Sequence, residues 1–202
     1  MTTSRDLMIT AMDVAPGHPL ERGRLSLALA GAELIDLLAA ETVTLDGDRI
    51  VPGLRVPLSD RLLNEAEESL VRESPYESVA DWLWRRGRNL SSAYLAALER
   101  EGQVARRRRR RLPFRTGRTE LTDSPDRRTA KERWTADEPV LAALGTALGL
   151  RGEAGPDGAL SETDDAAEEV LAGVNDALLE LEAVRQRHDI EQAAFDNIWR
   201  GD

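Results

Sequence analysis

The chain has no cysteine, and Lys131 is the only lysine among its 27 basic residues. Without cysteine it can form neither disulfides nor thiolate metal sites, which is typical of a protein from a reducing cytosol. Aromatic residues make up only 4% of the sequence, whereas hydrophobic residues make up 41%. We therefore expect residues 1–202 to form one domain whose core consists mainly of leucine, alanine and valine. The preference for arginine, together with many alanines, indicates a GC-rich bacterial genome.

No segment approaches about 18 consecutive apolar residues, the length that spans a bilayer. The N-terminal sequence MTTSRDLMIT has no basic stretch followed by a long apolar run, so we expect no signal peptide. These features predict a cytoplasmic protein, for which any membrane role is peripheral, at the inner face of the membrane.

The common catalytic motifs are also missing. The sequence has no Gly-rich phosphate loop, no G-x-S-x-G motif and no zinc signature. His188 and Glu191 lie three residues apart on a predicted helix, but two ligands do not make a metal site, and an exposed salt pair is the simpler interpretation. We therefore predict that the protein is not an enzyme and uses no metal or cofactor.

Charge is distributed very unevenly along the chain. The formal net charge is −10, yet residues 106–111 are six consecutive arginines. Between Trp82 and Arg118 there are twelve arginines and two glutamates, so this segment carries about +10 and the remainder about −20. Basic segments of this kind attract phosphate, either in nucleic acid or on an anionic membrane.

The hydrophobic pattern predicts a mainly α-helical bundle with two small β-hairpins. Residues 25–41 form a helix that is apolar on most sides and therefore central, and Asp46-Gly47 marks the first hairpin. Ser59 is expected to cap a helix whose inward stripe reaches Val71, and Gly102 to end a later helix. Further helices are expected at 7–13, 78–83, 127–134 and 139–150. The remaining segments are a projecting basic hairpin at 103–122, a flexible linker at 152–160 and an acidic tail of one or two helices at 161–202.

In this order, several segments resemble the Golgi phosphoprotein 3 family, including its bacterial relatives. The resemblance spans about residues 5–150 and rests on DLMITAMD, LALAGAELIDLL, TVTLDGDRIVP, LLNEAEESL, VADWLWR, YLAALEREGQV and an Arg-rich hairpin before RTELTD. It implies a compact helical domain that binds the cytosolic face of membranes as an adaptor, recognising phosphatidylinositol 4-phosphate. It also implies self-association through the hairpin and binding of protein cargo.

The family's lipid pocket transfers to this chain only in part. One pocket arginine corresponds to Arg88, but its partner three residues later corresponds to Ser91. The arginine that the family places in the buried helix corresponds to Ala30, and the pocket tryptophan corresponds to a position near Glu21. One of the four pocket positions therefore matches.

Arginines near two helix starts are the candidate phosphate ligands. Arg85, Arg86 and Arg88 come just before the helix that begins near Leu90, while Arg22 and Arg24 precede the central helix. Guanidinium groups bind phosphate bidentately, and helix N-termini add amide donors and positive dipole character. The alternative is that these arginines pair with the plentiful acidic residues.

Two tryptophans have different expected roles. Trp82 and Trp84 point about 200° apart on a helix, so only one can face the core. The family resemblance makes Trp82 the core residue. Trp84 is then placed at lipid headgroup depth beside the arginines, or packs against a neighbouring helix.

The arginine run supplies the candidate membrane-contact hairpin. It combines charge with two apolar side chains at the expected tip, and its residues are Arg106, Arg107, Arg108, Arg109, Arg110, Arg111, Leu112 and Phe114. A strand this charged also resists edge-to-edge pairing, which is a purely structural explanation.

We favour an anionic phospholipid surface as the partner. Nucleic acid is the main alternative, but the run has no interleaved aromatics for base stacking and no helix-turn-helix pattern appears. A protein-interaction scaffold without a lipid role is the third hypothesis.

Overall fold

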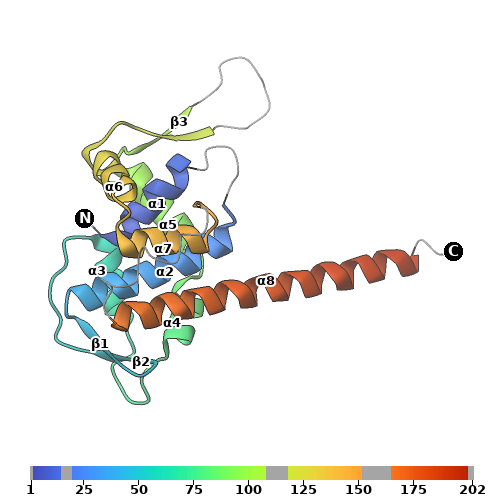
Figure 1. Ribbon diagram of the computed structural model, residues 1–202, viewed down its shortest axis with the longest axis horizontal. Coiled ribbons are helices and arrows are strands. Elements are labelled where there is room, and N and C mark those ends of the chain that lie inside the picture. Colours follow the sequence, from blue (N-terminus) through green and yellow to red (C-terminus); the bar gives the residue numbers. More distant parts are fainter. Residues whose placement is uncertain (1, 15–19, 108–117, 152–164, 200–202) are drawn as a thin grey trace.

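A computed structural model, drawn in Figure 1, describes residues 2–14, 20–107, 118–151 and 165–199. These residues form eight helices and two separate antiparallel two-stranded sheets, which confirms the predicted fold class. In chain order the elements are α1 (Thr3–Val14), α2 (Arg22–Ala39), β1 (Val43–Asp46), β2 (Arg49–Pro52), α3 (Arg61–Glu68), α4 (Val79–Arg86), α5 (Leu90–Arg100), β3 (Val104–Arg107), β4 (Arg118–Leu121), α6 (Pro125–Thr135), α7 (Pro139–Ala147) and α8 (Asp165–Trp199).

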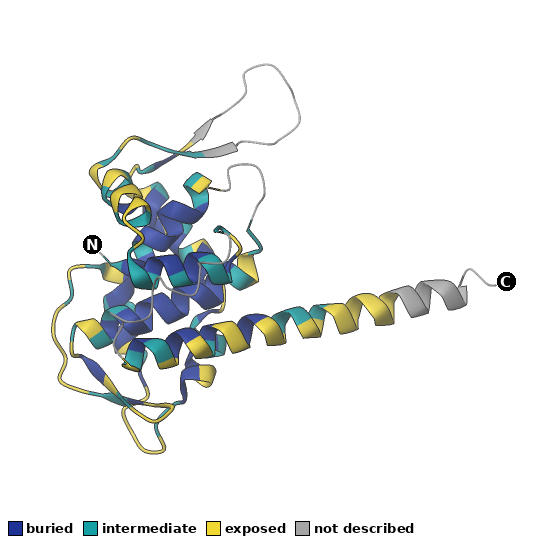
Figure 2. Ribbon diagram, viewed as in Figure 1, coloured by how far each residue is buried: buried dark blue, intermediate teal, exposed yellow. Residues whose placement is uncertain are grey.

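Helix α2 lies at the centre of the fold. Its residues from Leu25 to Ile35 are all buried, because α1, α4, α5 and α8 surround it. Figure 2 shows this region as the dark blue interior of the helical body. The near-continuous apolar sequence of α2 is what a helix covered on all sides requires.

Helix α8 is a single helix of 35 residues, where the sequence left one or two open. Its first half packs on α2 at Gly31, where a Cβ atom would lie 2.3 Å from Cγ2 of Val174. Glycine at this position therefore permits the close approach of the two helices. The C-terminal half of the helix projects away from the body (Figure 1).

The first hairpin has a two-residue loop, since Asp46 pairs with Arg49. Gly47 adopts φ +56°, the left-handed conformation that such turns favour. In the second hairpin, β3 pairs with β4 from Val104–Leu121 to Arg107–Arg118, at the periphery of the helical body. Residues 108–117, which include Arg108 to Arg111, Leu112 and Phe114, lie outside the described residues.

The helix caps refine the predicted boundaries. The cap of α3 is Asp60, not Ser59, and its Oδ1 accepts a hydrogen bond from the amide of Leu63 at 3.0 Å. Because α3 ends at Glu68, the predicted inward stripe stops before Val71, which is 39% exposed.

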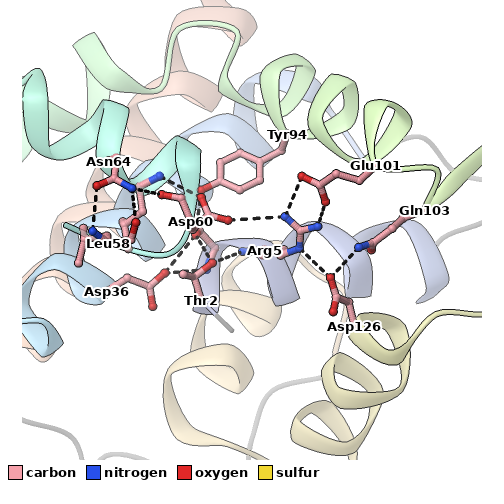
Figure 3. A network of polar contacts seen from close by, with 12 residues as sticks. Thr2, Arg5, Asp36, Leu58, Asp60, Asn64, Tyr94, Glu101, Gln103 and Asp126 are labelled. Carbon is pink, nitrogen blue, oxygen red and sulfur yellow. Dashed lines mark hydrogen bonds and ion pairs between the residues drawn. The ribbon is translucent and has the colours of Figure 1, made fainter.

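A polar network fastens the base of the second hairpin to the helices (Figure 3). Arg5 of α1 forms ion pairs with Asp60 at 3.6 Å, with Asp126 of α6 at 3.1 Å and with Glu101. Gln103, just before β3, donates to Asp126 at 2.6 Å. One half-buried arginine thus joins the starts of α3 and α6, the end of α5 and the start of β3.

Candidate functional site

A surface cavity of about 230 Å³ lies where the start of α2 meets the turn between α4 and α5. Its lining includes Arg22, Ser26, Trp84, Arg88, Ser91 and Leu181. Three of the six predicted phosphate-site residues, Arg22, Arg88 and Trp84, therefore share one cavity although 66 positions separate the two arginines in the chain.

Two helices begin at this cavity. Helix α2 starts after Glu21 and α5 starts after Asn89, and neither preceding residue makes a side-chain cap hydrogen bond. The two starts are joined directly, because Ser26 Oγ accepts from the amide of Ser91 at 3.0 Å and donates to Ser91 Oγ at 2.9 Å. The positive ends of both helix dipoles are consequently close to the cavity, where they favour an anion.

The side chains of Arg22 and Arg88 are exposed, and neither makes an ion pair with another residue of the described ranges. Guanidinium groups at such a position keep their charge and all their donors available to a ligand. The cavity is thus a concave, positively charged surface with two uncommitted cations.

The other three predicted arginines are held by protein groups. Arg85 donates to both oxygens of Glu77 at 2.6 and 2.7 Å and stacks over the ring of Trp82, 5.3 Å from its centroid. The hydrogen bond to Glu77 is the main cause that raises the pKa of Arg85. Arg24 donates to the carbonyl of Ala147, at the end of α7, at 2.8 Å.

Arg86 belongs to a buried polar cluster that sequence reasoning missed. It donates to Glu33 at 2.7 and 3.0 Å, Tyr94 donates its single hydroxyl hydrogen to Glu33 at 3.0 Å, and the Tyr94 oxygen also lies 2.8 Å from Ser4 Oγ. Burial raises the pKa of Glu33, and the hydrogen bonds from Arg86 oppose that rise. The available signal was a glutamate in the middle of the apolar run of α2 (Arg22–Ala39).

Trp82 is the core residue of the tryptophan pair, as predicted. It is 0% exposed and donates its indole N–H to the carbonyl of Ala30 at 3.0 Å. Trp84 is half-buried, packs against the core and forms part of the cavity wall.

Of the four positions that correspond to the family pocket, two line the cavity and two do not. Arg88 and Ser91 line the cavity, whereas Ala30 is fully buried in the core. Glu21 forms an ion pair with Arg185 of α8. In this chain the second cation of the cavity is Arg22, which the family pattern does not supply.

None of the helices in the described ranges is long and apolar enough to cross a bilayer. Among the described residues, no group of three or more His, Cys, Asp or Glu side chains is arranged to hold a metal ion.

The structure is that of a mainly α-helical protein with a basic cavity at two helix starts and a peripheral basic hairpin. The chain belongs to the Golgi phosphoprotein 3 family: the family model, Golgi phosphoprotein 3 (GPP34), matches residues 4–189. The match extends from α1 (Thr3–Val14) into the projecting half of α8 and confirms the resemblance seen in the sequence. No curated protein gives a significant match to the chain. The family is not known as a family of enzymes.

Proposed function

We propose that this protein binds the phosphate of an anionic phospholipid in the cavity between α2 and α5, and acts as a peripheral adaptor at the inner face of a membrane. One observation carries the proposal: Arg22 and Arg88, both exposed and without ion pairs among the described residues, meet at a cavity beside two helix N-termini. Each feature favours phosphate, and all of them act at one place.

The lining also suits a ligand attached to a membrane. Trp84 and Leu181 supply apolar surface beside the two arginines, and Ser92 and Asn89 supply neutral hydrogen-bonding groups for headgroup hydroxyls. By family resemblance the headgroup is phosphatidylinositol 4-phosphate. Arg22 and Arg88 together suit the single phosphate monoester of such a headgroup.

The Arg-rich hairpin is the proposed second contact with the membrane. Near an anionic surface each arginine contributes about 1 kcal/mol, so the run from Arg106 to Arg111 supplies attraction that does not depend on the headgroup. Leu112 and Phe114 are proposed to insert between lipid headgroups. Homo-oligomerisation through this hairpin and binding of a protein cargo complete the family-based proposal.

Liposome co-sedimentation tests the cavity. Vesicles of phosphatidylcholine alone, with phosphatidylglycerol and with phosphatidylinositol 4-phosphate are compared at low and physiological salt. Replacing both Arg22 and Arg88 by alanine is expected to lower the partition coefficient roughly 30-fold, since each cation contributes about 1 kcal/mol. The matched control is Arg61→Ala with Arg128→Ala, which removes two exposed arginines elsewhere on the surface and should change binding little.

Five outcomes separate the hypotheses. Binding that requires Arg22 and Arg88 supports the cavity, whereas equal losses in the control show that only net charge matters. No binding to any anionic vesicle at low salt ends the lipid hypothesis. Binding of duplex DNA or RNA with a steep salt dependence would favour the nucleic-acid alternative, and binding of neither would leave a protein-interaction scaffold.

A further inference from the structure

The projecting half of α8 exposes apolar side chains that the body does not cover. Leu179, just before this half, is 70% exposed, and Val184 and Ile190 within it are 49% and 68% exposed. Figure 2 shows exposed residues along the projecting half of the helix. The described residues offer the segment one anchor, the ion pair between Arg185 and Glu21. Because helices in proteins are stabilised mainly by packing of an apolar face, such a segment is suited to a partner.

Four of the exposed residues lie in a narrow stripe, which does not include the exposed Val184. Leu179, Ala183, Gln186 and Ile190 follow one another at spacings of four, three and four, and all four are exposed. At 100° per residue they fall within a sector of about 60°. We call them the outer stripe; it lies opposite the face by which α8 packs on the body through Val170, Val174 and Ala177.

This spacing is that of the a and d positions of a two-stranded coiled coil. Ala183 and Ile190 occupy a positions, and Leu179 and Gln186 occupy d positions. The body lies behind α8, so a second helix can reach the outer stripe without meeting it. A polar residue such as Gln186 within the seam is the kind of residue that fixes register at some cost in stability.

The flanking charges select a second copy in parallel orientation. Glu182 and Arg187 lie on opposite sides of the outer stripe, and parallel pairing places Glu182 of each copy beside Arg187 of the other. Antiparallel pairing brings Glu182 close to Asp189 and Arg187 close to Glu180, so one repulsive contact cancels the attractive one. Arg187 donates only to the carbonyl of Ala183, at 3.4 Å, among the described residues, so its charge is available.

A membrane is a poor occupant for this face. Between Asp165 and Trp199 the sequence has nine acidic residues and two arginines, so an anionic bilayer repels the helix. We propose that the outer stripe is a self-association surface, by which the α8 helices of two copies pair in parallel. The contact is separate from the basic hairpin and independent of the proposed lipid site.

Cross-linking reports the pairing directly, because the native chain has no cysteine. Ile190→Cys places a single thiol on the outer stripe, and Gln192→Cys places an exposed thiol on another face of the same turn. With a short bis-maleimide, Ile190→Cys is expected to form covalent dimers and Gln192→Cys is not. Equal cross-linking of both variants, or of neither, overturns the proposal. In a mixture with Leu179→Cys, cross-linking of Ile190→Cys to Leu179→Cys but not to itself indicates antiparallel pairing and also overturns it.

Sedimentation equilibrium measures the strength of the contact. Leu179→Glu is expected to raise the dimer dissociation constant roughly 100-fold, since the two copies lose two buried leucines. Leu179 is exposed in the single chain, so far-UV circular dichroism should show an unchanged fold. Arg187→Glu should weaken the dimer and Glu182→Arg in the same chain should restore it.

Salt distinguishes this contact from one made by the hairpin. Pairing of two acidic helices should persist or strengthen at high salt, whereas docking of the arginine run on an acidic surface should dissociate. A chain that stays monomeric at every concentration, or a dimer that high salt dissolves, refutes the α8 contact. Neither result bears on lipid binding through Arg22 and Arg88.

Discussion

Replacing Arg86 by methionine should separate a structural arginine from a ligand-binding one. Arg86 makes two hydrogen bonds to Glu33 and a third to the carbonyl of Leu62 at 3.0 Å. The side chain of Glu33 is 0% exposed and that of Arg86 is 15% exposed. Methionine keeps most of the aliphatic volume but leaves the carboxylate of Glu33 buried with only Tyr94 as a donor.

The expected loss is large. Breaking a buried ion pair by removing one partner costs about 3–5 kcal/mol, because the remaining charge is buried without compensation. For a chain of this size, that corresponds to a fall in Tm of roughly 10 °C. Combining Arg86→Met with Glu33→Gln removes the unpaired charge as well, so about half of the lost free energy of unfolding should return.

The loss should depend on pH in a defined direction. Burial holds the pKa of Glu33 above its ordinary value, and removing Arg86 takes away the main opposing interaction. Between the ordinary and the raised pKa the folded state binds more protons than the unfolded state, so stability falls as pH rises through that window. The deficit of Arg86→Met should therefore be smallest near pH 4, around the ordinary glutamate pKa, and largest above the raised pKa.

Urea denaturation at several pH values, followed by tryptophan fluorescence, measures the free energy of unfolding of each variant. Trp82, in the same helix as Arg86, is buried and therefore reports unfolding. Arg61→Met is the matched control: Arg61 pairs with Glu65 through side chains that are 55% and 44% exposed, and such pairs contribute under about 1 kcal/mol. If Arg86→Met and Arg61→Met cost the same, or if the loss does not change with pH, the reasoning is wrong. Lost lipid binding at full stability would instead make Arg86 a ligand.

Three further changes test the packing and the caps. Gly31→Val should destabilise the fold by about 1–3 kcal/mol through overpacking against Val174, and Val174→Ala should relieve part of that loss in thermal unfolding. Ser78→Ala should cost about 1 kcal/mol because the α4 cap, an amide of Asp81 bonded to Ser78 Oγ at 3.1 Å, is lost, whereas Ser78→Thr should be close to neutral. Asp36→Asn should cost about 1–3 kcal/mol, because Asp36 accepts the amides of Thr3 and Ser4 at the buried start of α1; an unchanged urea midpoint would contradict this.

The helices and turns could be predicted from the sequence because each depends on residues that are close together in the chain. The apolar run of α2 required a covered helix, Asp46-Gly47 required a tight turn, and Gly102 adopts the left-handed φ of +71° expected after a helix end. The error at Ser59 and Asp60 is of one residue, since both can cap and only packing selects between them.

The site could be predicted only in part. Arginines near helix starts were the right class of residue, yet the sequence cannot show which of them carry a carboxylate partner. Glu33 lies 53 positions from its partner Arg86, and Glu77 lies 8 positions from its partner Arg85, so no single spacing in the sequence identifies the pairs. Arg85 and Arg86 are paired with glutamates, whereas Arg22 and Arg88 are exposed at the cavity.

The sequence by itself determined the helices, the hairpin turns, the uneven charge and the family, because periodicity, turn chemistry and motif order depend on neighbours in the chain. The tertiary structure alone decided that Arg22 and Arg88 share a cavity, that Arg86 is internal, and that α8 continues beyond the body with an exposed stripe. These outcomes depend on which distant side chains meet. An arginine has the same charge on a buried glutamate as beside an open cavity, and only its neighbours in space decide what that charge can bind.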